Sequence, residues 1–398
     1  MVPKARFTHD GLDMNAMILK RFRSLPPMIR LLAGAMMGLG VVALGGATGA
    51  GTMPENTASA GSTARSAPLS RTAAPAGLAE AIAATARQFQ GKAGIAVVSI
   101  DQGWQVATGG EQRLPQQSVS KLWVAMTVMD ALDAGRLTLS SPVTVTREDL
   151  TVFHQPIAAM VKDDGYQTTV GDLLQRALTE SDNTANDRLL RFVGGPDAVR
   201  RFIAAKRLGD IRFGPGERLL QAQTAGLEWR PELATGNRFV RARAALPLSQ
   251  RLAAFDAYVA NPPDGAAPAA IAGALARLKR GELLSPFSTG YLIATMEASK
   301  TGKMRLRGAV PMGWRFGHKT GTGQNLVGRT AGYNDVGILT APDGRSYAIA
   351  VMIGDTPRPV SERQALMQAV VASIAAFHGP VEGQSQTASA GNGLGAIY

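Results

Sequence analysis

Three short motifs along the chain carry side chains that could act together in catalysis. They are Ser-Val-Ser-Lys at 118–121, Ser-Asp-Asn at 181–183 and Lys-Thr-Gly at 319–321. A serine hydroxyl is a weak nucleophile at neutral pH unless a neighbouring group takes its proton, and a lysine amine with a lowered pKa can do so. Brought into one pocket, the motifs would combine a serine nucleophile with two lysines. Their order therefore predicts an active-site serine hydrolase.

Ser118 stands where an irregular segment gives way to a strongly periodic apolar stretch, so we expect a helix over 118–135 that begins at this serine. The three-residue spacing would place Lys121 on the same helix face as the Ser118 hydroxyl. The helix dipole would also favour negative charge developing beside the serine. The alternative is that Ser118 only caps the helix while Lys121 points to solvent. Residues 181–183, taken alone, would likewise fit a cap and turn between two helices.

The tripeptide Lys-Thr-Gly occurs twice, and the two copies have different surroundings. The copy at 300–302 ends a helical run, where Gly302 fits a C-cap. The copy at 319–321 ends a predicted strand and is followed by Gly323, a residue type that lets a substrate backbone approach a sheet edge closely. We therefore assign Lys319 to the site.

Strand patterns occupy both ends of the folded part, and helical patterns occupy its middle. Helices are expected at 78–89, 118–135, 170–180, 185–193, 196–206, 268–280 and 361–377, and strands at 94–100, 105–107, 313–320, 331–339 and 347–353. This order implies an α+β fold in which the two ends of the chain build one antiparallel sheet and a helical domain is inserted between them. A site would lie in the cleft between the two parts.

The composition excludes several classes of function. The 398-residue chain has no cysteine, which removes disulfides, thiolate metal sites, a cysteine nucleophile and a lipid-acceptor residue. Its four histidines lack metal-binding spacing, so we expect no metal and no cofactor. The net charge of +12 comes without a basic run among aromatic residues, which argues against a nucleic-acid partner. A basic surface could still attract an anionic envelope polymer.

The amino end has the pattern of an export signal. Basic residues between 20 and 30 precede an uncharged apolar stretch over 31–50, with small residues suited to cleavage at 58–60. The alternative is a retained membrane anchor, because about 20 apolar residues can span a bilayer. We expect a signal or anchor at 1–60, a flexible linker at 61–77, a catalytic domain at 78–378 and a disordered tail at 379–398. The protein would then be periplasmic or secreted, or anchored to the inner membrane if uncleaved.

The three motifs, their order and their flanks resemble the class A β-lactamases and the related penicillin-binding serine hydrolases. The likeness covers nearly all of 78–378 and includes Ser181-Asp182-Asn183-Thr184-Ala185, Gly194-Gly195-Pro196, Gly281-Glu282-Leu283-Leu284, Met296-Glu297, Gly313-Trp314 and Tyr333-Asn334-Asp335. It implies a five-stranded antiparallel sheet flanked by helices in three α/β/α layers, with an inserted all-helical domain. The sheet lobe would comprise 78–117 and 300–378, and the helical lobe 118–299.

The resemblance also implies a role for each catalytic residue. Ser118 would attack an amide carbonyl, and Lys121 would accept its proton directly or through water. Ser181 would pass a proton to the departing nitrogen. Lys319 would hold a positive field on Ser181, and the two lysines would lower each other's pKa, which would help to keep Lys121 neutral.

The same resemblance assigns the residues that would bind substrate. Asn183 would hold the substrate's side-chain amide, and Asp182 would support it from a buried position. The strand edge at Thr320, Gly321 and Thr322 would bind the substrate carboxylate, and the backbone N–H groups of Ser118 and Thr322 would form the oxyanion hole.

Release of the acyl group depends on a glutamate in an E-x-x-L-N motif of the family. Glu217 to Gln221 falls at the family's separation from Ser181 without a gap, with glutamine in place of the usual asparagine. Four residues apart on a short helix, Glu217 and Gln221 could hold one water. A competing alignment places this loop at 229–233, where Arg230 stands in the glutamate's position. We prefer Glu217 as the base, because the other alignment requires an insertion and leaves no base. The alternative is that Glu217 has no catalytic role and merely begins a helix.

In the preferred alignment, residues 222–263 are an insertion relative to the family, with a helical piece at 249–261. The insertion could line the cleft mouth or pack peripherally. Arg329 is the nearest arginine that could bind the substrate carboxylate.

Together these patterns predict an exported serine hydrolase of the class A β-lactamase type that opens the β-lactam amide through an acyl-enzyme on Ser118. The alternatives are a peptidoglycan D,D-peptidase and a penicillin-binding sensor of the same fold with slow turnover. The expected partner is a small β-lactam or a peptidoglycan stem peptide, and the protein is expected to be a monomer.

Overall fold

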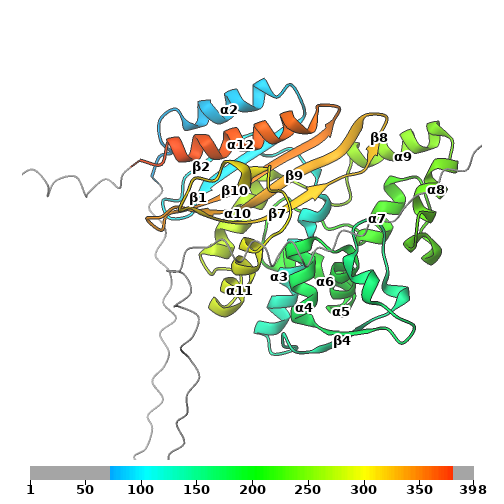
Figure 1. Ribbon diagram of the computed structural model, residues 1–398. Coiled ribbons are helices and arrows are strands. Elements are labelled where there is room, and N and C mark those ends of the chain that lie inside the picture. The colour runs from blue at the N-terminus through cyan, green and yellow to red at the C-terminus, as the bar shows by residue number, and fades with distance from the viewer. Residues whose placement is uncertain (1–71, 380–398) are drawn as a thin grey trace, which may run out of the picture. The chain divides into compact units, whose positions relative to one another are not determined.

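A computed structural model of the chain describes residues 72–379 (Figure 1). The predicted signal or anchor at 1–60, most of the linker and nearly all of the predicted tail lie outside these residues. The helices are α2 (Leu78–Gln88), α3 (Lys121–Asp133), α4 (Val170–Gln175), α5 (Asn183–Phe192), α6 (Gly195–Ala205), α7 (Glu217–Thr224), α8 (Arg238–Ala245), α9 (Leu248–Ala260), α10 (Pro268–Lys279), α11 (Pro286–Glu297) and α12 (Val360–Ala376). The strands are β1 (Ala93–Ser99), β2 (Gln105–Thr108), β3 (Leu114–Pro115), β4 (Pro142–Val145), β5 (Tyr166–Thr169), β6 (Gly265–Ala266), β7 (Arg315–Thr322), β8 (Asn325–Leu326), β9 (Arg329–Thr340) and β10 (Ser346–Thr356).

The main sheet is antiparallel, with strand order β2-β1-β10-β9-β7, and the two-residue β8 pairs with β9. Strands β1 and β2 come from the start of the described chain, and β7, β9 and β10 come from its end. The two groups are joined where β1 pairs with β10 over seven residue pairs, from Ala93–Ile353 to Ser99–Tyr347. The helices between them occupy the middle of the chain (Figure 1). This arrangement confirms the α+β fold, and the short β8 adds a sixth strand to the five predicted ones.

The central strand β10 shows why the sheet is covered on both faces. Its side chains alternate between two separate apolar clusters, with Ile349 and Val351 in one and Ala350 and Met352 in the other. A strand that is apolar on both sides must be buried on both sides. Helices α2 and α12 cover one face, where Ile82 and the α12 side chains pack, and α10 and α11 lie on the other (Figure 1).

Helix α3 is the centre of the helical part. Its side chains are buried almost all around the helix, including Trp123, Met126 and Met129, each fully buried. A helix that is apolar around its circumference is stable only when other elements surround it, and α5, α6 and α11 pack against α3. The catalytic candidate at its start is therefore fixed to the most buried helix of this part.

The segment 222–263 contains α8 and α9, and α9 agrees closely with the predicted helix at 249–261. Phe255 and Tyr258 of α9 are buried against Leu326 and Ala331 at the β8–β9 edge of the sheet. Arg243 of α8 lines the cleft described below. The segment thus does what both interpretations suggested: one part packs on the sheet edge and another reaches the cleft mouth.

Two local expectations were wrong. The helix expected from Ser118 begins at Lys121, because residues 117–120 form a tighter 3-10 turn first. Gly302 is not a C-cap, since α11 is capped by Ala298. Gly302 has φ 68°, and a Cβ there would lie 2.5 Å from Cγ2 of Thr320, so its small size permits close packing against β7.

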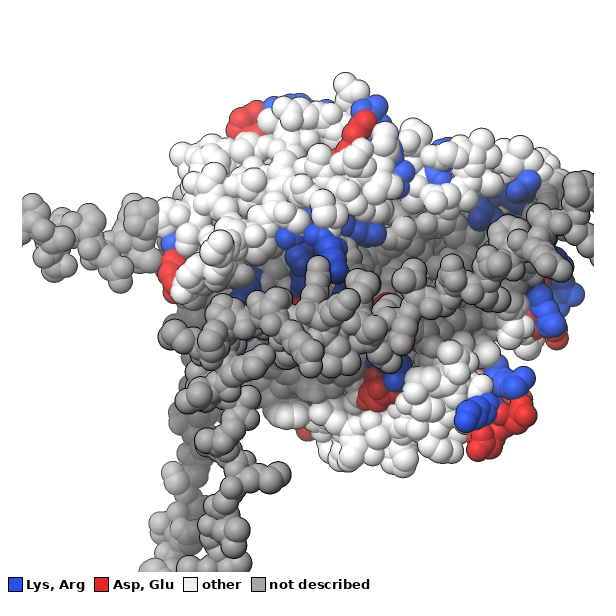
Figure 2. Space-filling model, in the orientation of Figure 1, with Lys and Arg blue, Asp and Glu red and all other residues white. Residues whose placement is uncertain are grey.

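On the face shown in Figure 2, basic side chains form several separate groups, and several of these lie beside acidic side chains. Between residues 72 and 379, no helix is both long and apolar enough to cross a membrane.

Candidate active site

A cavity of about 510 Å³ opens where the helical part meets the end of β7. Its walls include side chains from all three motifs and from the E-x-x-L-Q segment: Ser118, Ser181, Asn183, Glu217, Gln221 and Thr320. Residues more than 200 positions apart in the sequence therefore line one cleft, the kind of concave surface in which ligands bind.

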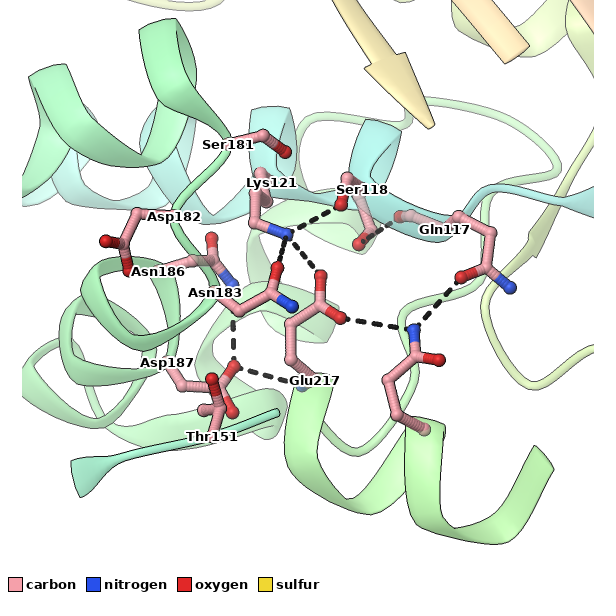
Figure 3. Close-up of polar contacts among 12 residues, drawn as sticks. Gln117, Ser118, Lys121, Thr151, Ser181, Asp182, Asn183, Asn186, Asp187 and Glu217 are labelled. Atoms are coloured by element: carbon pink, nitrogen blue, oxygen red, sulfur yellow. Dashed lines mark hydrogen bonds and ion pairs between the residues drawn. The ribbon is translucent and has the colours of Figure 1, made fainter. Parts of the chain in front are cut away.

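Ser118 and Lys121 are brought together by the turn that precedes α3. Lys121 is fully buried, and its Nζ donates hydrogen bonds to Ser118 Oγ at 2.8 Å and to Asn183 Oδ1 at 2.9 Å (Figure 3). Ser118 is therefore not an ordinary helix cap with a solvent-exposed lysine beside it. The backbone before the serine is unusual, because Gln117 has φ 54°, a conformation that costs about 1–3 kcal/mol in a non-glycine residue.

The second motif is positioned by a distorted helix end. Helix α4 continues as a π-helical turn over 176–180 and stops at Ser181, which has φ 63°. The Asp182 carboxylate accepts hydrogen bonds from the backbone N–H groups of Ala185 at 2.9 Å and Ile157 at 2.7 Å. Asp182 thus caps α5 and ties the neighbouring loop to it, in the buried position expected for a support.

Lys319 reaches the second motif from β7. Its Nζ lies 2.8 Å from Ser181 Oγ, and its side chain is fully buried. Burial, together with the nearby charge of Lys121, holds the pKa of Lys319 well below its usual value. The sequence predicted that two lysines would share one pocket. In the structure each lysine contacts one serine of the cleft, Lys121 with Ser118 and Lys319 with Ser181.

Glu217 is the first residue of α7 and is almost fully buried. Its carboxylate forms an ion pair with Lys121 (Figure 3). Gln221 Nε2 lies 3.4 Å from the other carboxylate oxygen. Burial alone would raise the pKa of Glu217, but the charge and hydrogen bond of Lys121 outweigh it and leave the pKa below its usual value. In the competing alignment, Arg230 and Glu232 are exposed and do not line the cavity.

Helix α7 is held at the site by Asp187 of α5. Its carboxylate accepts hydrogen bonds from the backbone N–H groups of Glu217 at 3.0 Å and Arg218 at 3.2 Å. An acidic group at a helix start satisfies N–H groups that the helix itself leaves open. The spacing of Glu217 from the second motif therefore has a direct structural cause.

Gln221 is held between two glutamines that the sequence analysis did not identify. Its Nε2 donates to Gln117 Oε1 at 3.0 Å, and its Oε1 accepts from Gln324 Nε2 at 2.9 Å. All three side chains are buried. The longer glutamine in place of the family's asparagine is thus used to connect the turn before Ser118 with the loop after β7.

Glycines at the end of β7 allow the strand edge to pack tightly. A Cβ at Gly321 would lie 2.3 Å from the carbonyl oxygen of Gln116, and one at Gly323 would lie 2.1 Å from that of Ala331. No side chain can replace hydrogen at such distances without moving the backbone. Thr322 is exposed beside them, and Thr320 Oγ1 lies 2.9 Å from Thr301 Oγ1 of the second Lys-Thr-Gly copy.

The arginine beside the end of β7 at the cleft is Arg305, and Arg329 lies elsewhere. Arg329 forms ion pairs with Asp355 and Asp256 and does not line the cavity. Arg305 lines it, donates to Thr322 Oγ1 at 2.5 Å and lies 3.8 Å above the ring of Tyr333. The loop that carries Arg305 has no periodic pattern, so no sequence signal connected it with β7.

Two histidines lie at or near the site. His318 is fully buried in β7, with Nδ1 2.7 Å from Asp335 Oδ1, which agrees with a packing role. His154 lines the cavity, and its carbonyl oxygen accepts a hydrogen bond from the Asn183 backbone. Within the described residues, no group of three or more His, Asp or Glu side chains is arranged to hold a metal ion.

A buried lysine is shared between a serine and a glutamate, and a second lysine–serine pair lies across the cleft, on an α+β scaffold. This arrangement is suited to serine acyl transfer. The chain belongs to the β-lactamase enzyme family, whose model matches residues 77–377.

Individual relatives agree with this assignment. The chain is 30% identical over 270 residues to the extended-spectrum β-lactamase PER-1 of Pseudomonas aeruginosa, covering 66% of this chain and 74% of the relative. It is 28% identical over 284 residues to the β-lactamase Toho-1 of Escherichia coli, covering 71% and 83%.

Solved structures agree as well. A β-lactamase from Chitinophaga pinensis matches with a TM-score of 0.61 and 26% identity over 75% of this chain and 97% of that one. An ancestral class A β-lactamase matches with a TM-score of 0.58 and 29% identity, over 75% and 99%. The class A resemblance drawn from the motifs is confirmed.

Proposed function

We propose that the protein is an exported serine β-lactamase that opens the β-lactam amide through an acyl-enzyme on Ser118. One observation carries this proposal: a single buried amine, Lys121 Nζ, contacts the hydroxyl of Ser118, the amide oxygen of Asn183 and the carboxylate of Glu217. These contacts connect Ser118 as the nucleophile with the Lys121–Glu217 pair as the base, and Asn183 orients the Lys121 amine.

In the proposed acylation step, Ser118 Oγ bonds to the β-lactam carbonyl carbon and loses its proton to the Lys121–Glu217 pair. Because Lys121 is already hydrogen-bonded to the carboxylate, a proton can pass from the amine to Glu217 as another arrives from the serine. The carbon–nitrogen bond then breaks, and the nitrogen takes a proton from Ser181. Lys319, 2.8 Å from Ser181 Oγ, can return a proton to that hydroxyl.

The negative charge on the carbonyl oxygen needs donors that are in place beforehand. We assign this role to the backbone N–H groups of Ser118 and Thr322, at the start of the α3 turn and the end of β7. Preorganised donors of this kind typically lower a barrier by about 3–4 kcal/mol each. Arg305, beside Thr322, and Lys319 supply positive charge for the substrate carboxylate.

Before deacylation Glu217 releases the acylation proton to solvent, and Lys319 regains one from it. Glu217 then takes a proton from a water molecule that attacks the acyl carbon, and Ser118 Oγ leaves as a hydroxyl with a proton returned through Lys121. Its buried carboxylate contacts Lys121, which in turn contacts Ser118. The pKa of Glu217 is below its usual value, so the carboxylate is ionised at neutral pH. Gln221, four residues along α7, orients the second carboxylate oxygen.

The test is steady-state hydrolysis of a chromogenic cephalosporin by the secreted form of the protein, with Ser118→Ala as the control. We expect turnover in the wild type and none in the variant. Intact-mass spectrometry after mixing with a penicillin then reports adduct lifetime. A persistent adduct would indicate a penicillin-binding sensor, and release of D-alanine from a stem peptide with poor β-lactam turnover would indicate a D,D-peptidase.

Export is part of this proposal and rests on the pattern of residues 1–60. Mass spectrometry of the mature amino terminus after cell fractionation tests it. A full-length chain in the cytoplasmic fraction would refute export and would leave the chemistry at Ser118 unaffected.

A further inference from the structure

The segment 222–263 adds a positive charge to the cleft that the mechanism above does not use. Arg243 of α8 lines the cavity, and its Nη2 donates a hydrogen bond of 3.0 Å to the carbonyl oxygen of Asn325, beyond the end of β7. This contact fixes the guanidinium at the cleft rim, and among residues 72–379 its Nη1 has no hydrogen-bond partner and can bind a ligand.

Contacts along the cleft wall show which end of the substrate Arg243 would face. The side chain of Asn183, which we assign to the acyl amide, donates to the carbonyl oxygen of Val152 at 2.8 Å. The next residue, Phe153, packs edge-on against Phe239 of α8 with ring centroids 5.0 Å apart. Arg243 follows Phe239 by one helical turn. Helix α8 therefore borders the acyl side-chain end of the cleft, and Arg305 serves the carboxylate end beside Thr322.

The charge at this end has no counterion among the residues that the structure describes. Nε of Arg243 and Nε of Arg251 are both buried without a hydrogen-bond partner, and of residues 72–379 none offers either guanidinium an ion pair. Asp256, the acidic residue on α9, is already paired with Arg329 at 2.8 Å. Burial lowers the pKa of Arg243, and repulsion from the charge of Arg251 lowers it further. An anion placed here would relieve that repulsion.

We infer that Arg243, supported by Arg251, forms a subsite for an anionic group on the acyl side chain of the substrate. The side chain of Phe153 is 50% exposed and lies between this subsite and Asn183, so it offers an apolar surface for the part of the side chain that leads to the anion. The favoured substrates are β-lactams whose acylamino side chain ends in a carboxylate. This inference rests on the proposed function and adds a specificity to it.

The test compares two cephalosporins that are identical except that the oxyimino oxygen carries a carboxymethyl group in one and a methyl group in the other. Acylation rates are measured by intact-mass spectrometry, together with kcat/KM, for the wild type and for Arg243→Gln. An arginine–carboxylate contact at a partly exposed site contributes enough for about a fivefold preference. We expect Arg243→Gln to lose this preference for the carboxymethyl compound and to leave acylation by the methyl compound within about twofold.

Two further variants separate charge from structure. Arg243→Lys should retain part of the preference, because it keeps the positive charge, and Arg241→Gln, exposed on the same helix, should leave it unchanged. Added salt should weaken the preference in the wild type, since it screens partly exposed charges. Equal acylation of both compounds by the wild type, or an unchanged preference in Arg243→Gln, would overturn the subsite while the lactamase function stands. Acylation by neither compound would refute the proposed function and the subsite with it.

Discussion

Replacing Glu217 with glutamine would test the proposed deacylation step directly. The amide has the size of the carboxylate and can keep the contact with Gln221, but it cannot accept a proton from water or from Lys121. In the variant Lys121 has no carboxylate to hold its proton, so the amine, 2.8 Å from Ser118 Oγ, can take the serine proton without the relay through Glu217, whereas hydrolysis of the acyl-enzyme still requires a base for water. The variant should therefore acylate and then remain acylated.

The size of the effect follows from the role assigned to the carboxylate. A positioned general base contributes about 10²–10⁴-fold, so deacylation should slow by that factor, equivalent to about 3–5 kcal/mol in the barrier. The variant also leaves Lys121, which is 0% exposed, without its carboxylate partner. Losing one member of a buried ion pair costs up to about 3–5 kcal/mol, so a lower midpoint of urea unfolding should accompany the kinetic change.

The assay is intact-mass spectrometry at timed intervals after mixing with a penicillin, combined with stopped-flow measurement of the burst. The matched control is Glu232→Gln, which changes the exposed glutamate of the competing alignment and should leave adduct lifetime at the wild-type value. An adduct that disappears as fast in Glu217→Gln as in the wild type, with the variant shown to be folded, would refute Glu217 as the base. A long-lived adduct already in the wild type, unchanged in Glu217→Gln, would favour the other alignment, which leaves no base.

Three further predictions concern single side chains. Lys319→Ala should lower kcat/KM in the cephalosporin assay by about 10²-fold or more, because it removes the amine beside Ser181. Lys300→Ala, in the second Lys-Thr-Gly copy, removes only an exposed ion pair with a glutamate and should change kcat/KM by less than about twofold. Arg305→Ala should raise KM about tenfold, whereas Arg329→Ala should leave KM unchanged; the reverse result would restore Arg329 as the carboxylate-binding residue. Burial raises the pKa of Asp264 from 3.8 to about 6, so the stability that its protonated form contributes is complete below pH 4 and is lost as pH rises through about 6. The free energy of unfolding in urea should therefore be measured for the wild type and for Asp264→Asn at several pH values. Between pH 4 and pH 7 the variant should become more stable relative to the wild type by up to about 3 kcal/mol. A stability difference that does not change with pH would contradict the raised pKa of Asp264.

Local patterns predicted the parts of the site that are fixed by local geometry. Ser118 and Lys121 are three residues apart at a helix start, so one turn of backbone suffices to bring hydroxyl and amine together. The strands were identified from their apolar runs, because a sheet covered on both faces buries nearly every residue of β10. Two-residue strands such as β3 and β6 give no periodic signal, and their pairing depends on where the larger elements place them.

Side chains that reach the site from unpatterned loops were not predictable in this way. Arg305 follows α11 in a segment without regular structure, and its guanidinium is directed by the carbonyl oxygens of Gly321 and Asn334 and by the ring of Tyr333. Each of those partners depends on the register of β7 and β9, which a single sequence does not reveal. Arg329, by contrast, is close to Lys319 in sequence, but it pairs with Asp355 and does not line the cavity.

The turn before Ser118 shows how the segment 222–263 and the nucleophile depend on each other. Gln117 is held in its unfavourable conformation by Asp264, which accepts its backbone N–H at 2.7 Å, and by Tyr258, whose hydroxyl lies 2.6 Å from Gln117 Nε2. Its Oε1 accepts from Gln221 of α7. Strained backbone persists only where its surroundings fix it, and here three separate elements do so. The same contacts orient the N–H of Ser118 that we assign to the oxyanion hole, so the packing of α9 on the sheet edge also determines the geometry at the reacting carbonyl.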